Sequence, residues 1–339
     1  MTPQQPSDGS ALRRLIIGYR VSQALHVVAV LGIADLLKDG PRHFNDLARS
    51  SDTHAGSLYR LLRLLASVGV FTEQGEGCFA LTALAQHLRS DIPESLCTRA
   101  MFDGARGNWD AWGNLLTSIK TGRPAIEHTF GKDLFGYLND HPDEGKIFNE
   151  VMAVQTSTAT QAILDAYDFS GIDTLVDIGG GVGVLLAAIL HNYPSMRGIL
   201  YDQPHVTADA ESRFTSVGVA DRCETAGGDF FESVPVGGNA YILKHILHDW
   251  DDQDCLRIIK NCRSAIAENG RLLVIEMLNP PGDTPHYGKF VDLQMLVITK
   301  GGRERTEAEY RKLFASAGFR LSRVVPTGSD VCLIEGRPA

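Results

Sequence analysis

A cluster of glycines between a strand pattern and a helix pattern constrains this chain more than any other feature. Residues 174–178 (TLVDI) are typical of a buried strand, and the apolar segment 184–191 has helical spacing. Gly179, Gly181 and Gly183 lie between them. A strand, a glycine-rich turn and a helix open a Rossmann-like unit, whose glycines permit positive φ and let a ligand approach the backbone. The helix that follows offers free N–H groups to an anion.

The spacing of these glycines argues against a dinucleotide. A dinucleotide turn has the pattern G-x-G-x-x-G, but Val184 occupies the third glycine position. The turn instead reads Asp-x-Gly-x-Gly-x-Gly from Asp177, which suits a nucleoside that bears a carboxylate.

Acids also follow the next two predicted strands. Asp202 ends the second strand, where an acidic residue can accept both ribose hydroxyls. Asp229 and Phe230 follow the third strand, where they could bracket an adenine ring. One such acid is as often a helix N-cap or a solvated turn residue. Three acids after successive strands favour a nucleoside site over those simpler roles.

A family resemblance rests mainly on four segments of the second half, 175–183 (LVDIGGGVG), 228–231 (GDFF), 243–251 (LKHILHDWD) and 301–306 (GGRERT). The chain resembles the cation-independent, S-adenosylmethionine-dependent small-molecule O-methyltransferases, such as plant caffeic-acid enzymes and bacterial natural-product tailoring enzymes. The resemblance extends from about Leu12 to Gly336. It implies S-adenosylmethionine as cofactor, S-adenosylhomocysteine as its product, and a phenolic, phenazine, quinone or polyketide-like aromatic acceptor. The cofactor-binding residues expected from the turn, the strand ends and the resemblance are Asp177, Gly179, Gly181, Gly183, Asp202, Gly228, Asp229, Phe230 and Lys244.

The 339 residues are enough for two domains. From residue 171, strand and helix patterns alternate, which predicts an α/β domain with a mostly parallel sheet. The resemblance makes this a Rossmann-like methyltransferase domain with seven strands. We expect strands near 174–178, 198–201, 222–226, 240–244 and 271–276, and a final antiparallel pair at 320–325 and 331–335. The expected division is a disordered tail (1–10), a winged-helix-like dimerisation domain (11–100), connecting helices that contribute to the acceptor pocket (101–170) and an S-adenosylmethionine-binding catalytic domain (171–339).

The first domain has the pattern of helices followed by a hairpin. Helical spacing covers 12–31 and 44–49, and a strong helix at 58–68 is expected to be capped by Asp52 or Thr53 and to end at Gly69. A hairpin over 70–81 completes a winged-helix layout, and Lys and Arg outnumber Asp and Glu by 8 to 4 in residues 11–70. We expect no DNA binding, because apolar residues over most of helix 58–68 predict burial rather than groove reading. In the resembling family this layout dimerises, so a homodimer is expected.

Composition excludes several classes of protein. A net charge of −9 argues against a general nucleic-acid binder. No uncharged apolar run reaches the roughly 18 residues that suggest a membrane helix, and residues 1–10 lack a signal-peptide core. The six cysteines show no C-x-x-C spacing, which indicates reduced thiols in the cytoplasm.

His248 is the predicted general base. It follows strand 240–244, at the edge where open α/β sheets bind ligands. A phenol with a pKa of about 10 must lose its proton as its oxygen attacks, and an imidazole with a pKa of about 6.5 is partly neutral at pH 7 and can accept that proton. Glu276 and Glu304 match acids that flank the catalytic histidine in the resembling enzymes. One of them would hydrogen-bond the second ring nitrogen and fix the tautomer.

A histidine at this position could instead cap a helix or bind a metal ion. His245 lies three residues earlier, where the family tolerates other residues. His245, His248 and Asp249 could also resemble a metal-ligand set. We expect no metal cofactor, because metal-dependent catechol enzymes of this chemistry tend to be shorter and to lack the N-terminal domain.

The acceptor pocket is less determined by sequence. Trp109, Trp112, Leu115, Leu116 and Ile119 predict one connecting helix, and its tryptophans are expected in an interdomain core. Thr299 stands where plant phenylpropanoid enzymes often carry Asn, which disfavours a caffeic-acid-like substrate. Apolar side chains in this set would suit a flat aromatic ring. The residues that match acceptor positions of the family are Phe148, Met152, Gln155, Asp249, Met295 and Thr299.

Three alternative functions are compatible with parts of the pattern. A winged-helix regulator could sense S-adenosylmethionine, although helix 58–68 speaks against it. A nicotinamide oxidoreductase is disfavoured by Val184. A relative that catalyses decarboxylation or hydroxylation would keep the fold, but His248, Glu276 and Glu304 favour methyl transfer.

Overall fold

The computed structural model describes residues 8–207 and 210–339, which form two compact units. The first unit reaches Asp110 and includes Leu138–Val154, and the second contains Ala111–Tyr137 and Gln155–Ala339. Residues 1–7 of the expected tail lie outside the described residues. Residues 8–10 were expected to be disordered, but they form the first turn of a helix.

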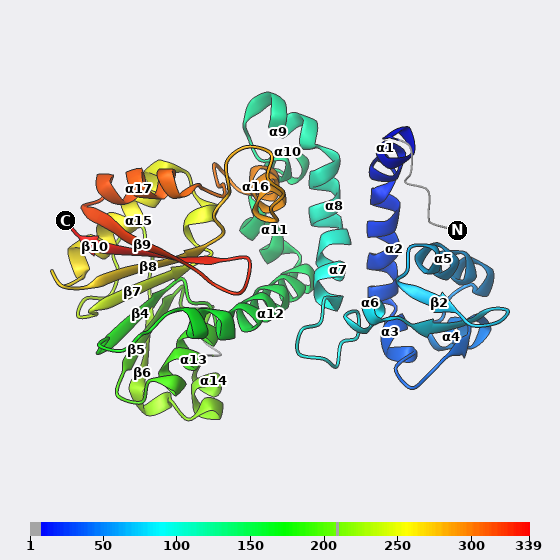
Figure 1. The fold of residues 1–339 in the computed structure, drawn as a ribbon, viewed down its shortest axis with the longest axis horizontal. Coiled ribbons are helices and arrows are strands. Elements are labelled where there is room, and N and C mark those ends of the chain that lie inside the picture. Colours follow the sequence, from blue (N-terminus) through cyan, green and yellow to red (C-terminus); the bar gives the residue numbers. More distant parts are fainter. Residues whose placement is uncertain (1–7, 208–209) are drawn as a thin grey trace. The chain divides into compact units, whose positions relative to one another are not determined.

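The first unit combines helices with a small antiparallel sheet of order β1-β3-β2 (Figure 1). The predicted hairpin is confirmed, and a short strand that the sequence did not indicate pairs with it at Arg42 and His43. The elements are α1 (Asp8–Ile16), α2 (Gly18–Val30), α3 (Ile33–Leu36), β1 (Arg42–His43), α4 (Phe44–Ser50), α5 (Ala55–Ser67), β2 (Phe71–Glu73), β3 (Cys78–Leu81), α6 (Ala83–Gln86) and α7 (Cys97–Gly104).

Helix α5 corrects two predictions. Its N-cap is His54, whose ring nitrogen accepts the N–H of Ser57, so neither Asp52 nor Thr53 caps it. Its buried residues, Leu58, Leu62 and Leu65, form one face, and Leu64 and Val68 are 39% and 45% exposed. The helix therefore buries one face in this unit and leaves apolar residues exposed on another, so the predicted burial over most of its surface was wrong.

The connecting helices are shorter than predicted. Residues 109–119 were expected to form one helix, but the chain breaks at Asn114 between two helices. Leu116 and Ile119 are exposed because they lie on the solvent side of the second one. The helices are α8 (Arg106–Gly113), α9 (Leu115–Thr121), α10 (Ala125–Phe130), α11 (Leu134–Asp140) and α12 (Pro142–Ala166).

The second unit is built on a seven-stranded sheet of order β6-β5-β4-β7-β8-β10-β9 (Figure 1). The five neighbouring strands from β6 to β8 are parallel, and β10 runs antiparallel to both β8 and β9, which confirms the predicted fold class. The strands are β4 (Thr174–Ile178), β5 (Arg197–Asp202), β6 (Cys223–Gly227), β7 (Ala240–Lys244), β8 (Arg271–Glu276), β9 (Phe319–Pro326) and β10 (Cys332–Pro338). The helical elements are α13 (Val184–Asn192), α14 (Ala210–Val217), η2 (Ala220–Arg222), η3 (Leu247–Asp249), α15 (Asp252–Ala265), α16 (Gly288–Ile298) and α17 (Glu307–Ser316).

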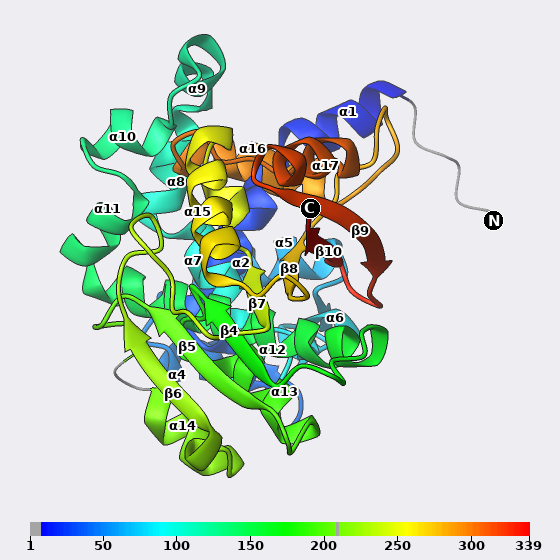
Figure 2. The same cartoon turned by 90° about the vertical axis from the view of Figure 1, so that its left-hand side faces the viewer.

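Helices cover both faces of this sheet (Figure 2). Side chains of a strand alternate between faces, so Leu175 joins the core under α12, α13 and α14, whereas Val176 joins the core under α15 and α17. Because neither face of the sheet is exposed to solvent, the strands have nearly continuous apolar sequences.

The parallel strands bring their carboxyl ends to one edge of the sheet. The turn after β4, Asp202 at the end of β5, Lys244 at the end of β7 and Glu276 at the end of β8 all lie there. The chain also switches direction of winding at β4, whose neighbours are β5 and β7. Ligands of open α/β sheets bind at such a switch point, so the fold places the predicted site residues where a ligand is expected.

Within residues 8–207 and 210–339, none of the helices combines the length and the hydrophobicity of a membrane span.

We expect Thr306 to anchor the start of α17. Its hydroxyl accepts the N–H of Glu309 at 3.3 Å, while Glu309 Oε2 accepts the N–H of Thr306 at 2.8 Å, which forms a capping box. Replacement by alanine should lower the free energy of unfolding by about 1 kcal/mol, measured by urea denaturation. Thr306→Ser, which keeps the hydroxyl, is the control, and equal stability of the two variants would contradict this assignment.

Candidate active site

The glycine-rich turn after β4 has the conformation that its sequence predicts. Gly179, Gly181 and Gly183 have φ values of 67°, 60° and 76°, in the region that favours glycine. A Cβ on Gly183 would also lie 2.6 Å from the ring of Phe214, so this turn packs closely against α14. At Gly181 a Cβ would meet no atom of the described chain within 4 Å, which leaves room for a ligand over the backbone.

Asp177, which is buried, and Lys244, which is half-buried, are two ionisable residues at the ends of neighbouring strands. Burial, and then the charge of Asp202, raise the pKa of Asp177 to about 7. Burial lowers the pKa of Lys244 to about 8, although Glu276 and Asp177 oppose that shift. Lys244 Nζ donates to Thr156 Oγ1 at 3.2 Å, but no described residue donates to Asp177 Oδ2, which is buried. A buried acceptor without a donor fits a ligand that brings hydrogen-bond donors to this turn.

Asp202 is held at the place predicted for a ribose partner. Its Oδ2 accepts the N–H of Gly181 at 2.9 Å and its Oδ1 accepts the N–H of Gln203 at 2.7 Å. These bonds fix the carboxylate beside the glycine turn and leave further lone pairs for hydroxyl donors. Burial raises the pKa of Asp202, and the two backbone bonds oppose that rise.

Phe230 belongs to an aromatic cluster that the sequence indicated only in part. Its ring meets Phe231 edge-on at 4.9 Å and Trp250 at 6.2 Å. It also lies 3.8 Å from a Cβ position on Gly179, beside the turn. Asp229 Oδ1 accepts the N–H of Phe231 and so fixes this segment.

The presence of glycine at position 228 has a structural explanation. A Cβ at this position would lie 2.2 Å from the hydroxyl of Tyr201, so close packing alone requires glycine. Its predicted contact with the cofactor stays a prediction.

His248 and Glu304 form the buried pair at the centre of the site. His248 lies on η3, and its Nδ1 is 2.7 Å from Glu304 Oε1. The carboxylate accepts the Nδ1 proton, which leaves Nε2 as the nitrogen that can exchange a proton with a ligand. Nε2 is 3.6 Å from Asp249 Oδ1. The structure thus favours Glu304 as the acid that orients the imidazole.

Glu276 has a different task from the one that a flanking acid suggests. It is fully buried, and its Oε1 accepts the N–H groups of Ile246, Leu247 and His248 at 3.0–3.3 Å. Its Oε2 is 3.6 Å from His248 Nδ1, beyond a hydrogen bond. Burial opposes ionisation, but the charge of His248 and the backbone bonds hold the pKa of Glu276 below its usual value. Glu276 therefore shapes the turn that carries the histidine.

The charge state of His248 corrects the expectation of a partly neutral imidazole. Burial disfavours the charged ring, but the carboxylates of Glu276, Asp249 and Glu304 outweigh burial and raise the pKa of His248 to about 10. Burial also raises the pKa of Asp249 to about 6 and raises that of Glu304. In the free site His248 is consequently protonated at neutral pH.

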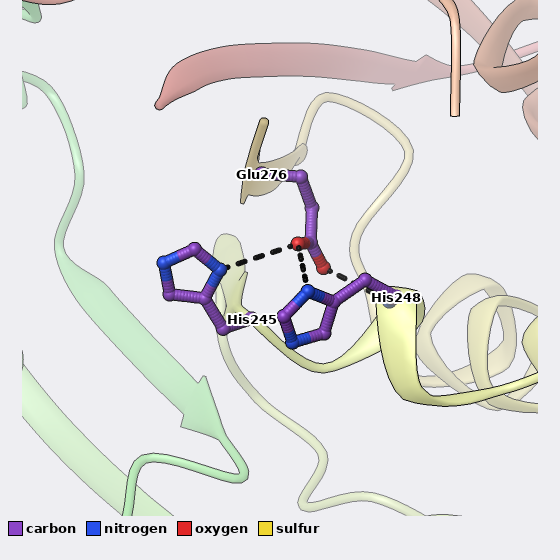
Figure 3. A group of neighbouring side chains, drawn as sticks. All are labelled: His245, His248 and Glu276. Atoms are coloured by element: carbon purple, nitrogen blue, oxygen red, sulfur yellow. Dashed lines mark hydrogen bonds and ion pairs between the residues drawn. The ribbon is translucent and has the colours of Figure 1, made fainter. Parts of the chain in front are cut away.

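The ring of His245 stacks beside that of His248 (Figure 3). Its ring lies 5.0 Å from that of His248 at an interplanar angle of 28°, and its φ of 53° is unusual for a residue other than glycine. Burial lowers the pKa of His245 to about 3, so the ring is neutral. The metal-ligand set considered from sequence contained Asp249, but the groups that converge are His245, His248 and Glu276.

Sequence reasoning missed the residues that hold this turn in place. Arg305 is fully buried and donates to the carbonyls of Leu247 and Trp250 at 2.7 and 2.8 Å, and to Asp252. Asp292 on α16 accepts the N–H of Glu304 at 2.9 Å. The arginine stands in the GGRERT segment, so its position was visible, but its contacts depend on the folded loop.

The predicted acceptor residues are divided between the two units. Met295 and Thr299 are buried near the end of α16, and the Thr299 hydroxyl donates to the Met295 carbonyl at 2.8 Å. Gln155 belongs to the same unit. Phe148 and Met152 belong to the first unit, where the Phe148 ring lies 5.5 Å from that of Phe102. Their roles at an acceptor stay predictions.

Trp112, which was expected from sequence in an interdomain core, contacts α16. Trp112 Nε1 donates to Gln294 Oε1 at 2.5 Å, and both residues belong to the second unit. This bond fixes the end of α8 that belongs to the second unit against the helix that carries Met295, which the sequence pattern of α8 alone does not indicate.

Comparisons with known proteins agree on one family. Residues 112–320 match the O-methyltransferase domain model, and residues 13–91 match the O-methyltransferase dimerisation domain model. The phenazine O-methyltransferase PhzM of Lysobacter antibioticus is 47% identical over 329 residues, which cover 97% of this chain and 96% of that protein. The crystal structure of LaPhzM has a TM-score of 0.92 at 47% identity and covers 98% of this chain and 99% of its own.

A third similar protein was crystallised with ligands. The O-methyltransferase NcsB1 from neocarzinostatin biosynthesis, in complex with S-adenosylmethionine and 2-hydroxy-5-methyl naphthoic acid, has a TM-score of 0.83 at 32% identity. The match covers 94% of this chain and 96% of that one.

The Glu304 carboxylate should help to keep His248 protonated, together with Glu276 and Asp249. We expect Glu304→Gln to lower the pKa of His248, because the variant removes a negative charge that favours the imidazolium. Isotope-labelled histidine followed by NMR over a pH series measures this, with the His248 signal assigned by its loss in His248→Ala. An unchanged midpoint would show that Glu304 does not control the charge.

Proposed function

This chain belongs to the S-adenosylmethionine-dependent O-methyltransferase family, and from that premise we propose that His248 promotes methylation of a hydroxyl on an aromatic small molecule. The observation that carries the proposal is the buried His248–Glu304 pair at the ligand-binding edge of the sheet. Glu304 orients the ring, Glu276 shapes the turn, and Nε2 is left to meet the acceptor hydroxyl. When bound, S-adenosylmethionine supplies a methyl group that is already electrophilic.

The raised pKa of His248 sets the order of proton movements. At neutral pH the free site holds an imidazolium. A phenol that binds beside it releases one proton to solvent, which leaves either phenolate beside imidazolium or phenol beside neutral imidazole. A phenol with a pKa of about 10 matches the pKa of about 10 at His248, so these two forms are close in energy. The proton is then held on Nε2 while the oxygen attacks.

The cofactor side of the proposal rests on the turn after β4. The positive φ values of Gly179, Gly181 and Gly183 and the open space over Gly181 suit close approach of the cofactor to the backbone, and the free Oδ2 of Asp177 suits a donor such as an ammonium. Asp202 would accept ribose hydroxyls. Asp229 and Phe230 would bracket the adenine. Lys244 and Gly228 are the remaining predicted cofactor contacts.

The acceptor is proposed to be a flat, hydroxylated aromatic ring of the phenazine, naphthoate or related classes. One relative is named as a phenazine O-methyltransferase, and another was crystallised with a hydroxylated naphthoic acid. Met295 is buried and apolar, and Thr299 has already engaged its hydroxyl in the chain. We propose that both line the pocket with Gln155, Phe148 and Met152, and that Asp249 holds the acceptor hydroxyl.

The comparisons do not favour the alternative activities. PhzM and NcsB1 are named as O-methyltransferases, and neither is named as a regulator, a nicotinamide enzyme, a decarboxylase or a hydroxylase. Methyl transfer is therefore the reaction that we propose for this site.

We further propose a cytoplasmic homodimer that binds neither nucleic acid nor membrane. The exposed apolar residues of α1 and α2 support association through the winged-helix-like dimerisation domain at 11–100. Helices at 101–170 would contribute to the acceptor pocket, and 171–339 would form the catalytic domain.

Removal of the proposed base should separate chemistry from cofactor binding. We expect His248→Ala to lower kcat by about 10²–10⁴-fold, the range that a general base contributes. Calorimetric titration with S-adenosylhomocysteine should give the wild-type affinity and stoichiometry. Wild-type turnover by the variant would remove His248 from its role.

The opposite result is expected at Asp202. Asp202→Asn removes a charged acceptor for the ribose hydroxyls, and charge-assisted bonds contribute about 1.5–3 kcal/mol each, so the Kd for S-adenosylhomocysteine should rise about 10–100-fold. Asp221→Asn, at an exposed acid on η2, is the matched control. Equal affinity of both variants would argue against a ribose contact.

A further inference from the structure

His245 is an anomaly that the methyl-transfer site does not explain. Its backbone has a φ of 53°, a conformation that stores strain in a residue other than glycine. Its side chain is only 9% exposed. Among the described residues neither ring nitrogen makes a hydrogen bond, and Nδ1 has only an ion-pair contact with Glu276 Oε2 at 3.5 Å. Buried polar atoms are nearly always paired in folded proteins, so an unmade interaction is expected here.

Two further ligand atoms face this ring (Figure 3). His245 Nδ1 is 3.5 Å from Glu276 Oε2, and His248 Nδ1 is 3.6 Å from the same oxygen. Glu276 Oε2 is buried, and no described residue donates a hydrogen bond to it. The three residues come from the turn after β7, from η3 and from the end of β8, and one ligand atom of each lies within 4.8 Å of the others.

We propose that His245, His248 and Glu276 form an inhibitory site for a divalent transition metal ion such as Zn²⁺. Two imidazole nitrogens and one carboxylate oxygen are a ligand set that zinc uses in proteins. Metal–ligand bonds of about 2.0–2.1 Å at tetrahedral angles place neighbouring ligand atoms about 3.3–3.4 Å apart. Two of the three separations in this cluster, 3.5 and 3.6 Å, need to shrink only slightly to meet that geometry, and all three ligand atoms lie within 4.8 Å of one another.

Binding would stop the base in two ways. The ion takes the place of the proton on His248 Nδ1 and thereby breaks the 2.7 Å bond to Glu304 Oε1. A dication on Nδ1 also withdraws electron density from the ring, so Nε2 becomes a weaker proton acceptor. Metal binding would thus switch off the reaction of the proposed function, on which this inference rests. The site requires His245, whereas the hydrogen bond between His248 and Glu304 does not.

Cobalt(II) binding tests the site without reference to turnover. Purified, chelator-treated protein is titrated with Co²⁺ and its visible spectrum recorded, and Zn²⁺ is titrated by calorimetry. We expect about one ion per chain, with the visible bands of a four- or five-coordinate nitrogen and oxygen site. In His245→Asn the metal Kd should rise at least about tenfold, because asparagine tolerates positive φ but cannot replace the imidazole. His191→Asn, at an exposed histidine on α13, should bind as wild type does.

Inhibition is measured separately. Zn²⁺ should inhibit methyl transfer by wild type and by His191→Asn at concentrations that follow the calorimetric Kd, and a chelator should restore the rate. His245→Asn should need at least about tenfold more Zn²⁺, in line with its weaker binding. A thiolate charge-transfer band would place the ion on a cysteine and overturn the proposal, as would equal metal affinity of wild type and His245→Asn. These binding outcomes remain readable even if the acceptor is not of the proposed class.

Discussion

The site depends on the packing of the loop 301–305 against the turn 247–252. Gly301 forms a bridge with Trp250, and the N–H of Arg303 donates to the carbonyl of His248 at 2.8 Å. A Cβ on Gly302 would lie 2.5 Å from that same carbonyl oxygen, so only glycine allows this approach. Contact at this distance is what brings Glu304 to the ring of His248. Gly301 and Gly302 are therefore needed for the contact between Glu304 and His248.

Charge within this packing is balanced locally. Glu276 is stabilised by three backbone N–H groups, and Arg305 binds two carbonyls of the same turn, so the chain around His248 is held from both sides. Buried charges without such partners would be strongly destabilising, because burial penalises an unpaired ion by several kcal/mol. On the cofactor side, the pKa of Asp177 is raised and that of Lys244 is lowered, each mainly by burial, so neither holds its charge as firmly as it would in water. A charged ligand would supply the hydrogen-bond donor that the buried Asp177 Oδ2 lacks among the described residues.

The sheet could be predicted well from sequence because each strand is bounded by strong local signals. The apolar run 174–178 before the glycines coincides with β4, and the acids at 177, 202 and 276 all lie in or at the ends of their strands. Helix α5 was misjudged because composition alone does not tell which leucines face water. The actual cap at His54 was missed, since histidine is a rare capping residue next to the acids and hydroxyls that the pattern favours.

The division of labour between the two glutamates could not have been predicted from sequence. Both acids lie within reach of His248, and only the folded loop decides that Glu304 meets Nδ1 while Glu276 meets the backbone. The charge of the imidazole was missed for the same reason. Its ordinary pKa of about 6.5 describes a solvated ring, whereas here three carboxylates surround it.

That raised pKa bears on which acceptors the site can serve. With its pKa raised to about 10 by the surrounding carboxylates, His248 favours the protonated form at neutral pH. An imidazolium can pair with an oxyanion through a charge-assisted hydrogen bond, and that oxyanion forms more easily as its parent hydroxyl becomes more acidic. Hydroxyls on extended or electron-poor rings ionise more easily than simple phenols. The electrostatics of His248, Glu304 and Asp249 thus favour an oxyanion beside Nε2, independently of the shape of the pocket around them.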